Sequence, residues 1–339
     1  MSTIRDVARQ AGVSVATVSH VINATHYVSP ELHQRVVDAI EALNYRPNRL
    51  ARALSRKAVP LLALVVPDIS NPFWSCVARA VQDVTDKYGY SVIVCSTDGL
   101  LQRELRFLQS LSGWISGLIL HPYHVTHAQA NPYLGDDVAV VILGDFFTSQ
   151  EQPEDWDHVR GDNESGARAA VEHLIALGHR RIAYIEGPEG TPSSMRRSSG
   201  YRHALQEAGL PLAGELVIPG DYTREAGRAG VARLLALDEP PTAVFCANDL
   251  MALGALEAAQ RLGRQVPRDL SLVGFDDIDE AAQTTPPLTT IRQPPQQLGS
   301  VAAETLIERL NGRAEARRIL LEFSLVVRGS TAPPRSGPQ

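Results

Sequence analysis

The sequence predicts a small all-α head followed by an α/β body. Apolar residues recur at helical spacing over residues 3–43, and short apolar runs alternate with helical patterns from residue 60 onward. Residues 1–60 hold eight Lys or Arg and four Asp or Glu, a net charge of +4, so the remaining chain carries −10 of the total −6. A basic head on an acidic body favours binding of nucleic acid at one end only.

The head begins with two short helices joined by a turn at Gly12. Thr3 and Asp6 stand where an N-cap and its reciprocal partner belong, and Ser14 is placed to cap the second helix. One face of that helix is small or able to hydrogen-bond, which suits a DNA major groove. Its residues are Val15, Ala16, Thr17, Ser19, His20 and Asn23. The pattern predicts a DNA-reading helix-turn-helix, with a plain helical cap on a larger domain as the alternative.

A third helix is expected after Ser29, its N-cap, and Pro30, which suits a first helical turn. Its apolar stripe would close a three-helix core. The next stretch, PNRLARALSRK at residues 47–57, is helix-prone and basic and contains no acid. Because isolated helices shorter than roughly 12 residues are unstable in water, this segment is expected to order only on a polyanion.

In the body, the alternation predicts parallel sheets covered by helices on both faces. The expected strands are Leu61–Val66, Ser91–Cys95, Gly117–Leu120, Val138–Leu143, Arg181–Ile185, Ala243–Cys246 and Ser271–Phe275, with a last strand near 319–327. The expected helices lie near 75–88, 102–112, 165–177, 195–208, 224–237, 249–262 and 297–311.

Polar residues gather directly after the predicted strands. They are Asp68, Asp98, Asp145, Asn248, Asp249, Asp276 and Asp277. Ligands of open α/β sheets bind beyond the carboxyl ends of the strands, so this placement indicates a ligand site. The alternative is that these residues only cap helices, and Asp249 fits both interpretations equally. Asp276 is the better ligand candidate, because Asp277 could serve as the cap instead.

Aromatic residues lie in loops beside the same strand ends: Phe73, Trp74, Phe146 and Tyr222. Flat rings next to carboxylates and an arginine suit a sugar or a nucleobase, because rings cover an apolar face while ionised groups bind the polar edge.

Other chemistries are disfavoured. The sequence contains no Gly-x-Ser-x-Gly and no Walker motif, and the first strand ends in Pro67-Asp68, so no enzyme activity is expected. His121, His124 and His127 lack an accompanying acid or cysteine ligand and are interpreted as a solvated loop, with no metal and no cofactor.

Three features of the sequence indicate the cellular compartment of the protein: its cysteines, its lack of a long apolar run and its N-terminus. Cys76, Cys95 and Cys246 are odd in number and widely spaced, which indicates reduced core residues. No run approaches the roughly 20 apolar residues of a membrane span, and charged residues interrupt the N-terminus, so no signal segment is expected. We expect a cytoplasmic protein associated with the bacterial nucleoid.

A family resemblance covers nearly the whole chain. DVARQAGVSVATVSHVIN followed by RPNRLARAL resembles the N-terminus of the lactose-repressor/galactose-repressor family of bacterial transcription regulators. VVPDISNPFW, HLIALGHRRIAYIEGP, PTAVFCANDLMALGAL, VPRDLSLVGFDDI and PPLTTIRQP continue the resemblance in order and at family spacing. The stretch TVSHVIN is most similar to the purine-repressor branch. A periplasmic sugar-binding protein would share the body but would have no use for residues 1–58.

The resemblance implies a domain plan. Residues 1–46 would form the helix-turn-helix domain, 47–58 a hinge helix and 59–331 an effector-binding and dimerisation body, with 332–339 a disordered tail. The body would consist of two parallel-sheet subdomains, as in a periplasmic-binding-protein type I fold. The N-subdomain would span about 59–160 and 292–321, and the C-subdomain about 161–291 and 322–331.

The resemblance also implies DNA contacts. The expected residues are Thr3, Ser14, Val15, Ala16, Thr17, Ser19, His20, Asn23, Tyr45, Asn48, Ala51, Arg52 and Leu54. Leu54 is an apolar residue on a basic element, and the family inserts this leucine at a central CG of a near-palindromic operator. Reading two half-sites requires a homodimer. A tetramer-forming coiled coil is not expected, because the tail TAPPRSGPQ contains no heptads.

The expected effector site combines strand-end residues with family positions: Phe73, Trp74, Asp145, Phe146, Thr191, Ser193, Arg197, Tyr222, Asn248 and Asp276. Arg197 matches the family's effector arginine, three residues before Gly200-Tyr201. Purine-binding relatives place a second arginine where this chain has Thr191, which favours a sugar or sugar derivative over a purine. Whether the effector induces or corepresses, and whether a protein partner makes the regulator an activator, stay open.

Overall fold

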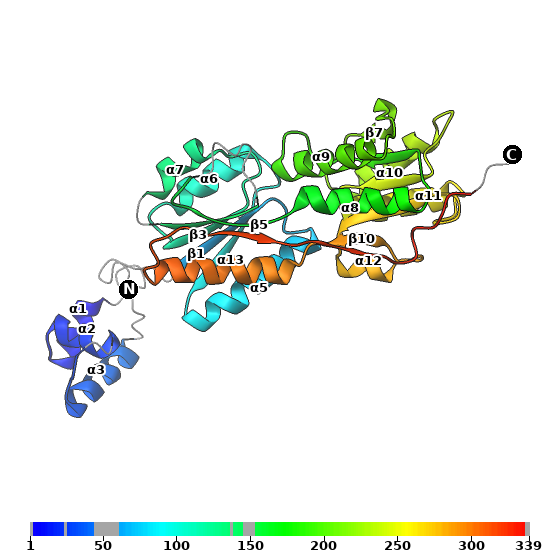
Figure 1. The fold of residues 1–339 in the computed structure, drawn as a ribbon. Coiled ribbons are helices and arrows are strands. Elements are labelled where there is room, and N and C mark those ends of the chain that lie inside the picture. Colours follow the sequence, from blue (N-terminus) through cyan, green and yellow to red (C-terminus); the bar gives the residue numbers. More distant parts are fainter. Residues whose placement is uncertain (1–2, 24–25, 44–60, 136–137, 145–152, 336–339) are drawn as a thin grey trace. The chain divides into compact units, whose positions relative to one another are not determined.

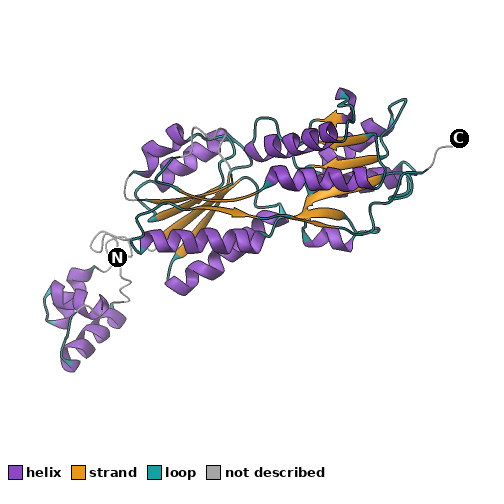
Figure 2. Ribbon diagram, in the orientation of Figure 1, coloured by secondary structure: helices purple, strands orange, loops and turns teal. Residues whose placement is uncertain are grey.

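The computed structural model describes residues 3–23, 26–43, 61–135, 138–144 and 153–335. Contacts divide the chain into two compact units, Met1–Pro60 and Leu61–Gln339, here called the head and the body. Figure 1 labels their elements and Figure 2 separates helices from strands.

The head consists of α1 (Ile4–Ala11), α2 (Val15–Asn23) and α3 (Pro30–Ala42). The predicted capping box is confirmed at α1: the Asp6 amide donates to Thr3 Oγ1 at 3.3 Å, and the Thr3 amide donates to Asp6 Oδ2 at 2.9 Å. Gly12 ends the helix with a φ of 65°, a left-handed conformation that favours glycine.

Ser14 caps α2, because its hydroxyl accepts from the Thr17 amide at 3.0 Å. Val7, Val18 and Val36, one from each helix, are fully buried at the centre of the head. Ser29 occupies the N-cap position of α3 but makes no side-chain capping bond, so this cap prediction is wrong.

The first sheet of the body has the order β11-β5-β4-β3-β1-β2, and all its pairings are parallel. Its strands are β1 (Leu61–Val66), β2 (Ser91–Ser96), β3 (Gly117–Leu120), β4 (Ala139–Leu143), β5 (Asp157–Gly161) and β11 (Arg318–Leu321). Its helices are α5 (Pro72–Thr85), the 3₁₀ turn η1 (Asp86–Tyr88), α6 (Leu101–Leu111), α7 (His127–Leu134) and α13 (Pro295–Leu310). Helices α5 and α13 pack together on one face, and α6 and α7 cover the other (Figure 1).

The second sheet has the order β12-β10-β9-β8-β6-β7 and is parallel except for the antiparallel pairing of β12 with β10. Its strands are β6 (Ile182–Ile185), β7 (Val217–Ile218), β8 (Ala243–Cys246), β9 (Ser271–Asp276), β10 (Thr289–Arg292) and β12 (Ser324–Val326). Its helices are α8 (Asn163–Ala176), α9 (Pro192–Glu207), η3 (Gly214–Leu216), α10 (Arg224–Leu235), α11 (Asp249–Arg261) and α12 (Asp279–Gln283).

Helices cover both faces of the second sheet. Gly166 of α8 lies against Phe275 of β9, whereas the next residue back, Gly274, lies against α11 at Asp249 and Ala252. Successive strand residues point to opposite faces, so α8 and α11 lie on opposite sides. The predicted class, a small all-α head and an α/β body built on two mainly parallel sheets, is confirmed.

The chain passes between the two sheets three times. It leaves the first sheet after β5, returns after β10 through α13, and crosses again between β11 and β12. The single strand expected near 319–327 is therefore two strands in two different sheets. The expectations also missed β5, β7, β10, α7 and α12.

The last residues of the body differ from the disordered tail expected at 332–339. The Ala332 carbonyl accepts from Ser271 Oγ at 3.1 Å and lies 3.0 Å from His179 Nε2, and Arg335 pairs with Asp269. Ala332 is thus bonded to β9 and Arg335 to the loop that precedes it, while 336–339 lie outside the described residues.

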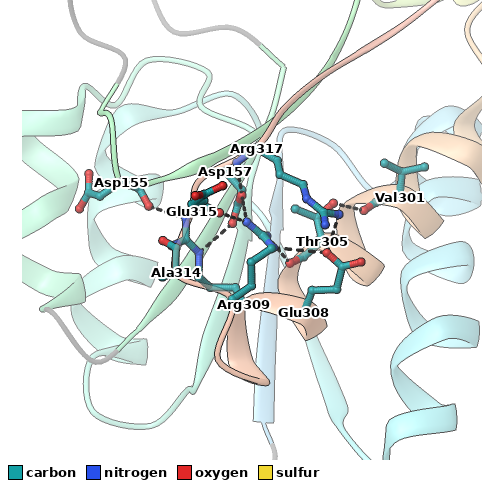
Figure 3. Close-up of polar contacts among 10 residues, drawn as sticks. Asp155, Asp157, Val301, Thr305, Glu308, Arg309, Ala314, Glu315 and Arg317 are labelled. Carbon is teal, nitrogen blue, oxygen red and sulfur yellow. Dashed lines mark hydrogen bonds and ion pairs between the residues drawn. The ribbon is translucent and has the colours of Figure 1, made fainter.

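A buried carboxylate joins the start of β5 to the end of helix α13 and to the residue before β11. Asp157, at the start of β5, is fully buried and pairs with Arg309 of α13 at 3.1 Å and with Arg313 at 2.9 Å. It also accepts from the Arg317 amide at 2.6 Å, just before β11 (Figure 3). Glu308 joins the network at its exposed edge, 2.6 Å from Arg317.

We expect Asp157→Ala to lower the free energy of unfolding of the body by about 3–5 kcal/mol, because two partly buried guanidinium groups lose their carboxylate. Glu308→Ala is the matched control and should cost less than about 1 kcal/mol, since that carboxylate is 45% exposed. Urea denaturation followed by circular dichroism measures both values. Equal losses would mean that burial of Asp157 contributes nothing beyond a surface ion pair.

Candidate functional site: a cavity between two sheets

A cavity of about 870 Å³ lies where the carboxyl ends of strands from both sheets meet. Residues that follow β1, β3 and β4 line one side, and residues that follow β8 and end β9 line the other. The chain thus places its ligand-sized space where open α/β sheets bind ligands.

Most of the predicted effector residues lie together in this cavity. They are Phe73, Trp74, Ser193, Arg197, Tyr222, Asn248 and Asp276. Asp68 and Asp98, singled out as strand-end carboxylates, also line it.

Arg197 of α9 is the central cation of the second-sheet side. It is only 5% exposed, and its guanidinium donates through Nε to Asn163 Oδ1 at 2.9 Å and through Nη1 to the Ala247 carbonyl. Its Cζ lies 3.8 Å from the ring centroid of Phe275, and its Nη2 lies 3.9 Å from Asp276 Oδ1. These contacts fix the guanidinium plane at the floor of the cavity.

Tyr222 and Asn248 form one unit. Tyr222 has a φ of 68°, unfavourable for a residue with a side chain, and Asn248 Nδ2 holds it by donating to its carbonyl at 3.0 Å. The Tyr222 hydroxyl lies 3.1 Å from Ser193 Oγ. Asn248 also caps α11, because its side-chain oxygen accepts from the Met251 amide at 2.9 Å.

The structure decides whether Asp249 and Asp277 act as helix caps. Asp249 neither caps α11 nor lines the cavity: it is fully buried and accepts from the Ile278 amide at 2.9 Å and from Thr290 Oγ1 at 2.6 Å. Asp277 is not a helix cap either, because it pairs with Arg292 and Arg328.

Asp276 is the buried carboxylate of the cavity, with 5% of it exposed. Burial raises its pKa to about 6, against the opposing effects of the nearby Arg197 charge and a hydrogen bond from Gln293 Nε2 at 2.6 Å. Asp249 beside it also has a raised pKa, mainly from burial and partly from the charge of Asp276. Asp276 is therefore ionised above about pH 6 and can then accept hydrogen bonds from a ligand.

Ligand affinity should consequently depend on pH. Protonation of Asp276 below about pH 6 removes an acceptor, so the affinity for a hydroxyl-bearing ligand should fall by up to about tenfold per pH unit below 6. It should level off above about pH 7. Titrations between pH 5 and 8 measure this, with Asp276→Asn expected to bind weakly at every pH. A flat profile for the unmodified protein would remove Asp276 from the ligand contacts.

Aromatic rings form the first-sheet side. The ring centroids of Phe73 and Trp74 are 5.0 Å apart in an edge-to-face arrangement, and His121 lies 4.5 Å from Trp74. His121 and His124 line the cavity, and His127 begins α7 against Trp156. The interpretation of the three histidines as a solvated loop is therefore wrong, although the described residues hold no group of three or more potential metal ligands.

Three predicted effector residues do not join this group. Thr191 is fully buried outside the lining, and its hydroxyl donates to the Pro188 carbonyl at 2.9 Å, so the structure does not support a ligand contact there. Asp145 and Phe146 lie outside the described residues.

Several lining residues were not predicted from the sequence, among them His121, Tyr123 and Gln293. One signal could have found His121: it follows β3 directly, just as Asp276 ends β9. A position directly after a parallel strand therefore indicates a ligand-facing residue for a histidine as well as for a carboxylate or an amide.

The candidate DNA face lies on the head. Thr3, Ser14, Val15 and Ala16 are exposed, with 42% of Val15 accessible, while Thr17, Ser19 and His20 are half-buried. Asn23 ends α2. An exposed patch of small and apolar side chains on a second helix has the form needed to contact bases. Tyr45, Asn48, Ala51, Arg52 and Leu54 lie outside the described residues.

The structure can also be compared with the expectations for the three cysteines and for membrane-spanning segments. Cys76 is half-buried and unpaired, and Cys95 and Cys246 are buried and unpaired. Among the described residues, the helices are all too short or too polar to cross a bilayer.

Comparison with known proteins agrees with this architecture. Residues 3–48 match the family model described as bacterial regulatory proteins, lacI family, and residues 171–331 match a periplasmic binding protein-like domain. The ribose operon repressor of Halalkalibacterium halodurans is 36% identical and covers 98% of this chain and 97% of its own length. The repressor PurR of Aliivibrio salmonicida is 34% identical, covering 94% and 95%.

Two solved structures extend the likeness over head and body. The Lac repressor dimer bound to operator and the anti-inducer ONPF has a TM-score of 0.83 at 31% identity, covering 98% of this chain and 99% of its own. The regulator CelR in complex with cellobiose has a TM-score of 0.73 at 34% identity, covering 97% and 100%. This chain therefore belongs to the lacI family of bacterial regulatory proteins, which bind DNA to control transcription and are not enzymes.

Proposed function

We propose that this protein is a homodimeric repressor that binds a near-palindromic operator with a central CG, and that a sugar or sugar derivative in the cavity controls operator affinity. The observation that carries the proposal is the cavity itself: carboxylate, amide, guanidinium and aromatic groups from two sheets converge on one space. Such a mixture suits a ligand with many hydroxyl groups and an apolar ring face.

The proposed mechanism follows from how the cavity is built. Its walls belong to the two proposed subdomains, about 59–160 with 292–321 and about 161–291 with 322–331. A ligand that contacts both walls stabilises one relative arrangement, and its differential affinity for two arrangements sets the coupling to DNA. Residues 47–58 would form the hinge helix that orders on the operator. The protein would act in the bacterial cytoplasm, associated with the nucleoid.

A purine or nucleoside is the second candidate effector. The 34% identity to PurR favours it, as does the purine-like stretch TVSHVIN of the DNA-reading helix. Against it stands Thr191, whose hydroxyl is bonded within the protein where purine-binding relatives are expected to place an arginine. The ribose operon repressor and the CelR–cellobiose complex support the sugar.

Selection of bound sequences from a random DNA library, with the full-length protein, tests the proposal. A palindrome of roughly 14–20 base pairs with CG at its centre is the expected result. Enrichment without ligand would indicate an effector that releases DNA, and enrichment only with ligand would indicate a corepressor. No enrichment in either condition would contradict a sequence-specific regulator.

A further inference from the structure

The loop after β3 is held in place by one buried acid. Glu104 of α6 is fully buried, and its carboxylate accepts from three successive backbone amides: Tyr123 at 2.8 Å, His124 at 3.0 Å and Val125 at 3.1 Å. Three donors on one carboxylate leave this loop little freedom to move. Because the loop begins at His121, Glu104 gives that part of the cavity wall a fixed shape.

The hydrogen bonding of His121 fixes its tautomer. Its Nδ1 lies 2.5 Å from the Leu143 carbonyl oxygen, which can only accept, so Nδ1 carries the hydrogen. Burial lowers the pKa of His121 to about 4, and the ring is therefore neutral near pH 7. In a neutral ring with hydrogen on Nδ1, the other nitrogen, Nε2, is a bare acceptor.

Nothing in the described part of the chain hydrogen-bonds to His121 Nε2. The ring lines the cavity beside Trp74, with 4.5 Å between centroids and 52° between planes. The two rings together form an aromatic surface with one acceptor at its edge. That combination matches a sugar ring, whose C–H face packs on aromatic rings while its hydroxyl groups donate.

The charges around the cavity disfavour an anion. The described residues contribute four carboxylates to its lining, Asp68, Asp98, Asp221 and Asp276, and two guanidinium groups, Arg160 and Arg197. Nε and Nη1 of Arg197 already donate to Asn163 and the Ala247 carbonyl, which leaves Nη2 to donate to a ligand, and Arg160 also has a partner. Among the described lining residues, a phosphate or carboxylate on the ligand would meet more carboxylates than guanidinium groups, so its charge would be repelled.

We propose that His121 is a ligand-binding residue that accepts a hydroxyl hydrogen through Nε2, that Glu104 positions it, and that the ligand is a neutral saccharide. This inference rests on the proposed function, because it names the charge class of the effector and one group that recognises it. It excludes sugar phosphates and sugar acids.

The first experiment is calorimetric titration of the full-length protein with D-ribose, D-glucose and cellobiose, and with ribose 5-phosphate, glucose 6-phosphate and glucuronate. At least one neutral sugar should bind, and its anionic counterpart should bind at least about 100-fold more weakly. Comparable affinity for a phosphate or an acid would overturn the charge argument. Binding by none of the neutral sugars would overturn the saccharide.

Variants of His121 provide the second experiment. His121→Phe keeps a ring against Trp74 but removes both nitrogens, so affinity for the bound sugar should fall about 10–100-fold. His121→Gln can return an oxygen acceptor near Nε2 and should recover part of the loss. His127→Phe is the matched control, since His127 does not line the cavity, and its affinity should stay within about twofold.

A third measurement tests the tautomer without any ligand. Long-range ¹H–¹⁵N correlation spectra should show one histidine, absent in His121→Phe, that is neutral with hydrogen on Nδ1 at pH 7. A protonated ring or the opposite tautomer would contradict the acceptor role.

The outcomes separate this inference from the proposed function. If a neutral sugar changes operator affinity and His121→Phe binds it as tightly as the unmodified protein, the role of His121 is wrong and the sugar-responsive regulator stands. If operator binding itself is absent, the proposed function is wrong.

Discussion

Replacing Arg197 with methionine is expected to lower the protein's affinity for its effector by about 100-fold while operator binding without effector persists. The guanidinium is 5% exposed at the cavity floor, and methionine keeps most of its aliphatic bulk. A hydrogen bond from a charged donor contributes about 1.5–3 kcal/mol to binding. The Arg197 charge also lowers the pKa of Asp276, so its loss should raise that pKa further and leave the carboxylate less ionised. Both changes weaken the same ligand contacts.

The neighbouring Arg196 is the matched control. It lies one position earlier on α9, outside the cavity lining, and pairs with Glu164 at 3.6 Å with 46% of its side chain exposed. Arg196→Met should therefore leave effector affinity within about twofold. Titration calorimetry for effector and fluorescence anisotropy for operator measure the two affinities separately. The circular dichroism and thermal midpoint of Arg197→Met are first compared with those of the unmodified protein. Equal loss of effector and operator affinity would indicate a misfolded variant.

The parts of the fold that the sequence predicted well depend on local rules. The capping box of Thr3 and Asp6 involves residues three apart, and the turn at Gly12 needs only its own left-handed φ. Strand β1 is a run of six apolar residues of which five are fully buried, so its hydropathy alone reveals it.

The missed strands depend on distant partners. β5 has the sequence DHVRG, which looks like a polar loop, yet Asp157 and His158 are buried there. Arg309 and Arg313, more than 150 residues away, compensate the buried charge of Asp157. No local pattern could predict that pairing, and the same reason explains the two-sheet division of the segment near 319–327.

In the site, too, some residues could be predicted from local sequence whereas others depend on distant partners. Arg197, Asn248 and Asp276 were predicted because they follow strands or match family positions, and the structure brings them together. Thr191 was predicted as a ligand contact from the alignment of a loop with the family. In the structure its hydroxyl donates to the Pro188 carbonyl instead. The position of His121 directly after β3 could have indicated a lining residue, but its tautomer depends on the Leu143 carbonyl of another strand, which no local pattern reveals.

The complementary prediction concerns Leu54, outside the described residues. Leu54→Ala is expected to abolish specific operator affinity, by about 100-fold or more, while effector affinity stays unchanged. An apolar side chain on a basic segment, wedged into the minor groove at a flexible central step, stabilises the bent DNA on which the other contacts depend. Alanine is too short to unstack that step.

Anisotropy titrations with the selected operator and with a scrambled duplex separate the effect of Leu54→Ala from general loss of DNA binding. Affinity for the scrambled duplex should change little, because the variant retains the five basic residues at positions 46–57, which we expect to contact phosphates. Leu54→Met is the control, since it keeps a flexible apolar wedge and should retain most of the operator affinity. Unchanged operator affinity in Leu54→Ala would reject the hinge wedge. Loss of effector affinity alone in Arg197→Met and of operator affinity alone in Leu54→Ala would establish two separate sites.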